Sequence, residues 1–224
     1  MTLKDIIKNL KIDVFFQPIV SLDSNKFIGF EALLRGLNNE GKTMYPKEIF
    51  DNLNQEEKEK LDIEAFNLAI TKAKKLNLHR DYLLFVNVCW ASPEDLARIL
   101  SLNNYPKNKI VIEICETMSE ERFKDFVSFF SKGDISFAID DFGSKQSNID
   151  RLLNCQNCAW IKIDKEIASL PFLSLVFSHL SKKSTYNIVI ERVEKETDLP
   201  TNKHRKNFFA QGFLFGKPSP NPFC

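Results

Sequence analysis

Short apolar runs typical of β-strands recur along the chain and are separated by stretches with helical periodicity. The helical stretches are residues 55–76, 92–102, 119–131 and 165–182, and Ser92 and Ser119 are typical helix N-caps. The expected strands are residues 14–20, 27–31, 82–88, 110–114, 136–140, 159–163, 188–191 and 209–213. This alternation predicts an α/β fold in which eight strands form a barrel inside a ring of helices.

The first two expected strands are joined differently from the others. Only residues 21–25, with the sequence SLDSN, separate them, and this segment is too short for a crossover helix but typical of a hairpin turn. One strand is therefore expected to run antiparallel to its neighbours. The predicted fold class is a TIM-like (β/α)8 barrel with one antiparallel strand, and residues 1–224 are expected to form a single domain.

Five of the expected strands end on an acid or an amide. Because functional groups of (β/α)8 barrels lie at the carboxyl ends of the strands, these side chains are expected to gather on one rim. A buried carboxylate is costly unless it is paired or bound to a metal. Taken singly, each acid is more often a capped or solvated carboxylate, but the set predicts a divalent metal site. Its members are Glu31, Asn87, Glu113, Asp140 with Asp141, and Glu191.

Composition and charge narrow the class of protein. The chain has 31 Lys and Arg residues against 30 Asp and Glu residues, so its net charge of +1 gives no general attraction to nucleic acid. No apolar run approaches the roughly 20 residues that span a bilayer, and the N-terminus lacks the pattern of a signal peptide. We therefore expect a cytoplasmic protein that binds neither nucleic acid nor membrane.

The chain has five cysteines, an odd number without a secretory signal, which predicts reduced thiols. Cys89 and Cys115 lie in strand-like segments and are expected in the core. Cys155 and Cys158 form a CxxC pair without a second pair or a neighbouring histidine, so a packing role is favoured over a zinc site.

Seven motifs, in order and at comparable spacing, resemble the EAL family of cyclic di-GMP phosphodiesterases. They are QPIV at 17–20, EALLR at 31–35, EICE at 113–116, DDFG at 140–143, KID at 162–164, ERVE at 191–194 and QGFLFGKP at 211–218. The resemblance implies a TIM-like barrel with one antiparallel strand, in agreement with the hairpin. It also implies hydrolysis of cyclic di-GMP to linear pGpG with two Mg²⁺ or Mn²⁺ ions per active site, which suits a set of hard oxygen ligands.

The resemblance gives each motif residue a role. Lys162 would contact the attacking water and the scissile phosphate, Glu191 would be a general base or a ligand of the second metal, and Glu194 would help to organise Lys162. Glu116 would anchor the loop that follows DDFG. The expected metal ligands are Glu31, Asn87, Glu113, Asp140 and Asp141, and the expected substrate contacts are Gln17, Leu33, Arg35, Asp164 and Gln211.

Two segments depart from the family pattern. The loop after DDFG reads SKQSNI at 144–149, with Lys145 in place of a glycine, and Arg192 stands where a glycine is expected. Arg192 either turns outward or displaces a metal ion. These departures leave a second function open, that of a weakly active or inactive domain acting as a cyclic di-GMP receptor or a protein-interaction regulator. A homodimer and a regulatory protein partner are left open as well.

Overall fold

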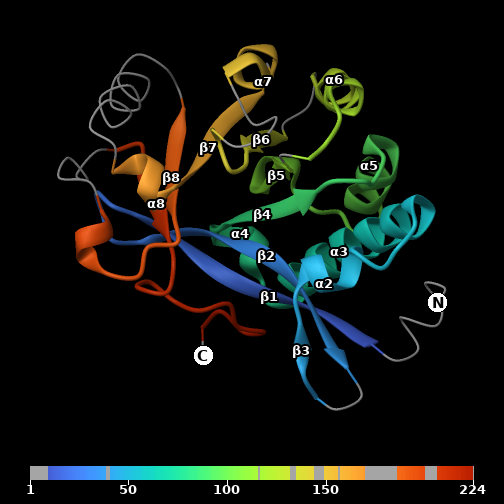
Figure 1. Ribbon diagram of the computed structural model, residues 1–224, viewed down its shortest axis with the longest axis horizontal. Helices are drawn as coiled ribbons and strands as arrows, with labels where there is room; N and C mark the ends of the chain where they lie inside the picture. Colours follow the sequence, from blue (N-terminus) through green and yellow to red (C-terminus); the bar gives the residue numbers. More distant parts are fainter. Residues whose placement is uncertain are drawn as a thin grey trace.

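The computed structural model describes residues 10–38, 41–115, 117–131, 135–143, 149–155, 157–169, 186–199 and 206–223, and the predicted barrel is confirmed (Figure 1). Eight strands close in the order β1-β9-β8-β7-β6-β5-β4-β2 and back to β1, and β3 is added to the free part of β2. The strands are β1 (Leu10–Ser21), β2 (Phe27–Asn38), β3 (Thr43–Met44), β4 (Leu83–Val88), β5 (Ile110–Ile114), β6 (Ser136–Ile139), β7 (Cys158–Asp164), β8 (Asn187–Glu191) and β9 (Phe208–Gln211). The α-helices are α2 (Pro46–Phe50), α3 (Gln55–Lys75), α4 (Leu78–Asp81), α5 (Pro93–Leu102), α6 (Glu120–Phe129), α7 (Ile149–Asn154) and α8 (Lys165–Ala168).

The antiparallel strand is β1, which runs opposite to both β2 and β9, whereas the other barrel pairs are parallel. The expected hairpin turn is present: the amide of Ser21 donates to the carbonyl of Lys26 over 2.9 Å, and Asn25 has a φ of 55°. Asparagine tolerates this left-handed conformation better than most residues. The short polar segment at 21–25 therefore fixes the direction of β1.

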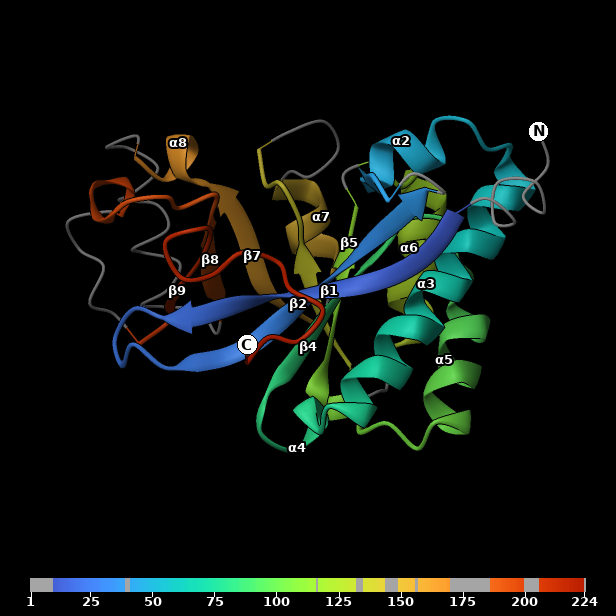
Figure 2. The ribbon, with the colours of Figure 1, turned by 90° about the horizontal axis from the view of Figure 1, so that it is seen from below.

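Strands β1 and β2 are longer than the sequence pattern predicted. They form a ribbon that extends past the barrel to α2 and α3 (Figure 2). A separate apolar cluster explains the extension, since Leu10 and Leu34 of the ribbon pack with Ile49 of α2 and Leu61 of α3. The additional strand β3 and helix α2 follow this extension directly, and neither they nor α4 and α7 were predicted.

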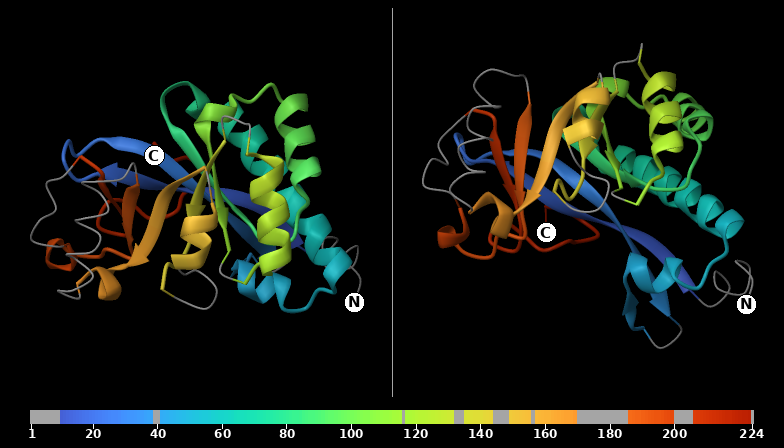
Figure 3. Two further views of the ribbon diagram at one scale, coloured as in Figure 1. Left: turned by 90° about the horizontal axis from the view of Figure 1, so that it is seen from above. Right: turned by 45° about the horizontal axis from the view of Figure 1, so that its top comes forward.

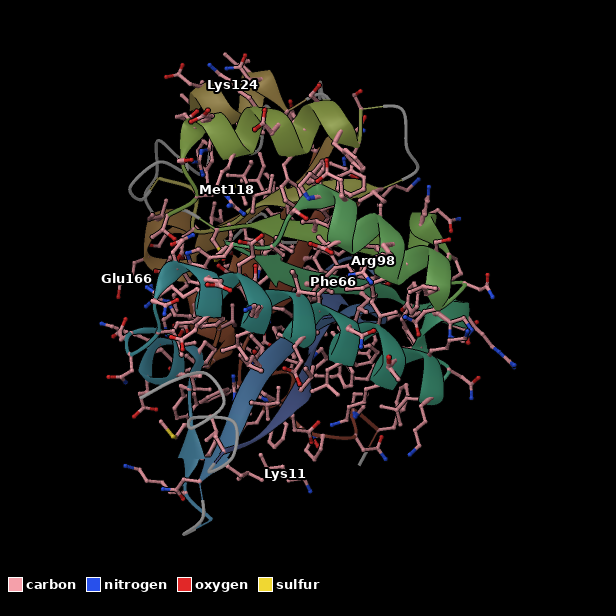
Figure 4. The ribbon with its side chains drawn as sticks, turned by 90° about the vertical axis from the view of Figure 1, so that its right-hand side faces the viewer. Lys11, Phe66, Arg98, Met118, Lys124 and Glu166 are labelled. Atoms are coloured by element: carbon pink, nitrogen blue, oxygen red, sulfur yellow. A yellow bond between two sulfur atoms is a disulfide. The ribbon has the colours of Figure 1, made fainter. Side chains whose placement is uncertain are left out.

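Helices α3, α5 and α6 pack against one side of the barrel (Figure 3). Phe66 of α3, labelled in Figure 4, is 1% exposed and belongs to the main core. The predicted N-caps are confirmed, because Ser92 Oγ accepts from the amide of Asp95 and Ser119 Oγ accepts from the amide of Arg122. Of the helix predicted over 165–182, the described part contains α8, and residues 170–182 lie outside it. No helix in the described ranges is long and apolar enough to cross a membrane.

The inside of the barrel is closed by a layer of apolar side chains. Seven strands contribute to this layer, and the Trp160 ring packs against Phe85 and Phe209 with centroid distances of 5.0 Å. The layer consists of Ile19, Phe85, Val111, Ala138, Trp160, Val189 and Phe209. Because side chains alternate along a strand, residues two positions further on also point into the barrel, one layer closer to the rim.

Candidate active site

The second interior layer is polar and contains most of the predicted site. On six parallel strands each polar member lies two residues after a residue of the apolar layer. On the antiparallel β1 the polar member lies two residues before the residue of the apolar layer. The members are Asn87 after Phe85, Glu113 after Val111, Asp140 after Ala138, Lys162 after Trp160, Glu191 after Val189, Gln211 after Phe209, and Gln17 before Ile19. Glu31 of β2 stands opposite Gln17 in the strand register. The alternation of the strands thus brings side chains from distant parts of the sequence into one ring.

Lys162 lies at the centre of this ring. Its Nζ is 2.8 Å from Glu113 Oε1, 2.9 Å from Glu191 Oε1 and 3.1 Å from Glu31 Oε2. A fourth carboxylate, that of Asp140, lies 3.5 Å away. One buried ammonium group therefore faces four carboxyl groups, more acids than a single cation can pair.

Amide side chains hold Glu31 in place. Asn87 Nδ2 donates to Glu31 Oε1 over 2.7 Å, and Gln211 Nε2 donates to Glu31 Oε2. Gln211 also donates to Gln17 Oε1 over 3.2 Å, and Gln17 in turn donates to the carbonyl of Gly216 over 3.1 Å. The predicted residues Gln17, Glu31, Asn87 and Gln211 thus form one hydrogen-bonded network beside Lys162.

Burial and the neighbouring charges shift the pKa values of the ring residues. Burial raises the pKa of Asp140 to about 6 and the pKa of Glu191 to about 8. Burial, together with the charge of Glu31, raises the pKa of Glu113 well above its usual value. Burial also acts to raise the pKa of Glu31, but the nearby Lys162 charge and the Gln211 hydrogen bond outweigh it and lower that pKa. Burial disfavours the charged form of Lys162, yet the surrounding carboxylates raise its pKa well above the usual value.

Two buried oxygens of the ring lack hydrogen-bond partners within the described residues. They are Oε2 of Glu113 and Oε1 of Gln211, whereas Oε1 of Glu113 and Oδ1 of Asp140 face the Lys162 ammonium group at 2.8 and 3.5 Å. Buried acceptors without donors are unusual in proteins and fit a site that takes up cations. In their present positions, however, no three histidine, cysteine or acidic side chains of the described part converge to hold one metal ion. The ammonium group of Lys162 lies among the carboxylates instead.

A cavity of about 360 Å³ opens above the ring. Its lining includes six residues that the sequence assigned to the site and three that it did not, Arg192, Gly212 and Phe213. The lining residues are Gln17, Glu31, Leu33, Glu191, Arg192, Glu194, Gln211, Gly212 and Phe213. The cavity therefore lies where a substrate would meet the acid ring.

The remaining predicted residues lie farther from Lys162. Glu194 lines the cavity and forms an ion pair with Lys165 at 4.0 Å, and its role in organising Lys162 stays a prediction. Arg35 is buried, donates to the carbonyl of Leu34 and lies 5.0 Å from the ring centre of Tyr45. Asp141 is exposed with a φ of 46°. Glu116 and loop residues 144–148 fall outside the described residues, so their predictions remain untested.

The side chain of Arg192 turns outward, which is one of the two outcomes expected for it. Its Nε and Nη2 both contact Oδ2 of Asp164, and its side chain is 69% exposed. Asp164 Oδ1 accepts from the amide of Glu166 over 2.7 Å and so caps α8. The Asp164 carboxylate that was expected to meet the substrate is therefore already occupied by Arg192 and by a helix N-terminus.

The prediction of reduced thiols is wrong for one pair, since Cys89 and Cys115 form a disulfide with a Cα–Cα distance of 5.3 Å. The strand register explains the pairing: Val88 of β4 lies opposite Ile114 of β5, and each cysteine comes directly after its strand. Cys155 and Cys158 are free and buried, as a packing role requires.

The two loops joined by this disulfide are held by two buried charged residues, neither of which was predicted to have a role. Asp62 Oδ2 of α3 accepts from the backbone amides of residues 89, 90 and 91. Arg151 of α7 donates to the carbonyls of Cys115 and Met118. An acid between Leu61 and Ile63 on the buried face of a helix was the available signal for Asp62.

Fold and site together define an α/β barrel with a ring of buried and partly buried carboxylates at the carboxyl ends of its strands. A family model described as the EAL domain matches residues 2–218, and the chain belongs to that family. The chain is 26% identical over 230 residues to the probable cyclic di-GMP phosphodiesterase PdeI of Escherichia coli, a match that covers 92% of this chain and 28% of PdeI. It thus spans less than a third of the length of that relative.

Two solved structures share the fold. A standalone versatile EAL protein from Vibrio cholerae, in a form bound to c-di-GMP, superposes with a TM-score of 0.76 at 22% identity over 94% of this chain and 93% of that one. The manganese and cy-diGMP complex of Klebsiella pneumoniae BlrP1 at pH 9.0 gives a TM-score of 0.73 at 22% identity over 95% of this chain and 60% of BlrP1. At this level of identity the likeness establishes the barrel alone.

Proposed function

We propose that this chain hydrolyses one phosphodiester bond of cyclic di-GMP and releases linear pGpG. The observation that carries the proposal is the ring of four carboxyl groups around a single buried ammonium group, with a cavity directly above it. Such a ring has more acids than Lys162 can pair, and burial, with a further contribution from the neighbouring acids, raises the pKa values of Glu191 and Asp140. The relatives called cyclic di-GMP phosphodiesterases and the c-di-GMP-bound EAL protein support the choice of substrate.

The residues present fit divalent cations. Their oxygens are hard ligands of the kind that Mg²⁺ and Mn²⁺ prefer, and Oε2 of Glu113 has no hydrogen-bond partner in the described residues. Two ions held there would lower the pKa of a bound water and neutralise charge on the phosphate. The manganese complex of BlrP1 supports this class of cofactor. The residues that would hold the ions are Glu31, Asn87, Glu113, Asp140 and Asp141.

Residues of the chain itself would perform the remaining tasks. Lys162, already within 3.1 Å of three carboxylates, would move its ammonium group toward the scissile phosphate once cations neutralise those acids. Glu191 would accept the proton of the attacking water on its carboxylate, since it lies on the cavity wall next to the ring. Substrate contacts would come from Gln17, Leu33, Arg35 and Gln211, whereas Glu194 is close enough to the cavity to orient Lys165 or the substrate.

The test is direct. Purified protein is incubated with cyclic di-GMP and Mn²⁺ or Mg²⁺, and the products are separated by liquid chromatography. We expect pGpG from the wild type and a loss of at least about a hundredfold in the Glu31→Ala variant, because that change removes a predicted ligand and breaks the amide network. If the wild type forms no more pGpG than Glu31→Ala, hydrolysis is excluded.

One observation favours a second function, that of a metal-independent cyclic di-GMP receptor. In the described structure the ammonium group of Lys162 lies between the four carboxyl groups, and no three acidic, histidine or cysteine side chains of the described residues are arranged to hold one metal ion. Calorimetry with EDTA separates the two functions, because a receptor binds cyclic di-GMP without metal and yields no pGpG when Mn²⁺ is added. A homodimer, a regulatory protein partner, a single-domain organisation and a cytoplasmic location stay predictions.

A further inference from the structure

Arg192 has a strained backbone at the edge of the cavity. Its φ of 58° is left-handed, a conformation that glycine adopts freely and that costs a residue with a side chain about 1 kcal/mol. The next residue packs tightly against the end of β9: the amide of Val193 donates to the carbonyl of Gln211, and a Cβ on Gly212 would lie 2.1 Å from the carbonyl oxygen of Val193. Strain of this kind is retained where a side chain has a use, so the arginine calls for a functional explanation.

The guanidinium group is held by one of its edges. Its Nε–Nη2 edge contacts Asp164 Oδ2, and the Asp164 side chain is only 8% exposed. Because Oδ1 of Asp164 is fixed by the amide of Glu166, the carboxylate cannot easily turn away from Arg192. Asp164 therefore orients Arg192 rather than leaving it as a freely moving surface cation.

The adjacent edge of the guanidinium, formed by Nη1 and the second hydrogen of Nη2, makes no hydrogen bond within the described residues and remains for a ligand. A guanidinium presents parallel N–H donors on this edge, which match a pair of neighbouring acceptors. Arg192 also lines the cavity over the acid ring, next to Glu191. We propose that Arg192, held by Asp164, binds the O6 and N7 acceptors of one guanine of the substrate and so selects guanine over adenine.

This inference rests on the proposed function, since it assumes a cyclic dinucleotide in the cavity. Guanine presents two adjacent acceptors on its O6/N7 edge, whereas adenine presents one acceptor and one donor there, so two parallel donors discriminate between the bases. A phosphate would also accept two hydrogen bonds, but the charge of Arg192 is already neutralised by Asp164. A neutralised, oriented guanidinium favours recognition of a base edge over attraction of an anion.

The test compares cyclic di-GMP with cyclic di-AMP, which has the same phosphates and different bases. Dissociation constants are measured by calorimetry with the full chain and Ca²⁺, for the wild type, Arg192→Gly and Arg192→Lys. Lys217→Ala is the matched control, because Lys217 lies 5.3 Å from the ring centre of Phe213, a residue of the same cavity wall. Arg192→Gly is expected to fold, because glycine relieves the strain at this position.

We expect Arg192→Gly to weaken cyclic di-GMP binding about tenfold and to change cyclic di-AMP binding by less than about twofold. Arg192→Lys should behave like Arg192→Gly, because an ammonium group lacks the paired donors. Lys217→Ala should change the dissociation constants of the two ligands by the same factor. Equal weakening of both ligands by Arg192→Gly, no weakening, or full rescue by lysine would each overturn the inference.

Failure of the proposed function gives a different result. In one case the wild type prefers cyclic di-GMP, Arg192→Gly loses that preference, and no pGpG forms with Mn²⁺. This result supports the assignment of Arg192 and excludes hydrolysis. If pGpG forms and Arg192→Gly keeps the preference for cyclic di-GMP, hydrolysis is supported and the assignment of Arg192 is excluded. A wild type that does not bind cyclic di-GMP overturns both.

Discussion

The ammonium group of Lys162 lies 2.8 Å from Oε1 of Glu113, and the two side chains are 1% and 0% exposed. Removing one partner of such a buried pair leaves charge without compensation, which typically costs about 3–5 kcal/mol. Here three further carboxylates share the same cation. Lys162 is therefore expected to stabilise the metal-free protein in addition to any catalytic role.

We predict that Lys162→Met lowers the free energy of unfolding of the metal-free protein by about 3–5 kcal/mol at pH 8, measured by urea denaturation with EDTA. Lys165→Met is the control, because Lys165 forms a partly exposed pair with Asp198 at 3.1 Å and should cost about 1 kcal/mol or less. Mn²⁺ should restore part of the stability of Lys162→Met. An equal loss in the free energy of unfolding for Lys162→Met and Lys165→Met would contradict the central role of Lys162.

The raised pKa values of two acids in the ring predict that the stability of the protein depends on pH. The pKa of Glu191 is raised to about 8 and that of Asp140 to about 6, so both bind protons more tightly in the folded state than in the unfolded state. Stability therefore decreases as the pH rises from about 4, where the unfolded carboxyl groups lose their protons, toward 8. We expect the melting temperature of the metal-free protein to fall between pH 5 and pH 8, as measured by calorimetry.

Glu191→Gln provides the comparison for this pH profile, because glutamine keeps the shape of the side chain but does not titrate. The decline between pH 6 and pH 8 should become shallower in this variant. A wild-type profile that rises over this range would show that the pKa values of these acids are not raised as described.

Metal binding should have the opposite dependence on pH. Cations compete with protons for the same carboxylates, so Mn²⁺ binds more tightly as the acids of the ring ionise. We predict that a fixed concentration of Mn²⁺ raises the melting temperature by several degrees more at pH 8 than at pH 5. Glu31→Gln should remove most of this stabilisation. If Mn²⁺ has no effect at either pH, the ring is not a metal site.

Much of the fold followed from local features of the sequence. The short segment 21–25 predicted the antiparallel strand, and Ser92 and Ser119 predicted two helix starts. The ends of the parallel strands predicted which acids would meet, because the carboxyl ends of such strands form one rim. These signals depend on a few neighbouring residues and so can be read without the structure.

Other features depend on contacts between distant segments. The extension of β1 and β2 is stabilised by Leu61 of α3, which is separated from Leu10 by most of two strands and a helix. The ion pair between Glu194 and Lys165 joins the segments that follow β8 and β7, and the motif pattern does not specify such a contact. The pairing of Cys89 with Cys115 requires the register of β4 and β5, which the alternation pattern does not specify.

The disulfide between Cys89 and Cys115 is the basis of the last prediction. It closes a loop with a sequence separation of 26 residues, and cross-links of this length stabilise proteins by about 2–4 kcal/mol. Dithiothreitol should therefore lower the melting temperature of the wild type and have no effect on a variant with both Cys89→Ser and Cys115→Ser. Reduction should also expose two additional thiols in the denatured wild type, measured by reaction with a thiol reagent. A thiol count that does not change on reduction would mean that the two cysteines are unpaired, as the odd number of cysteines first indicated.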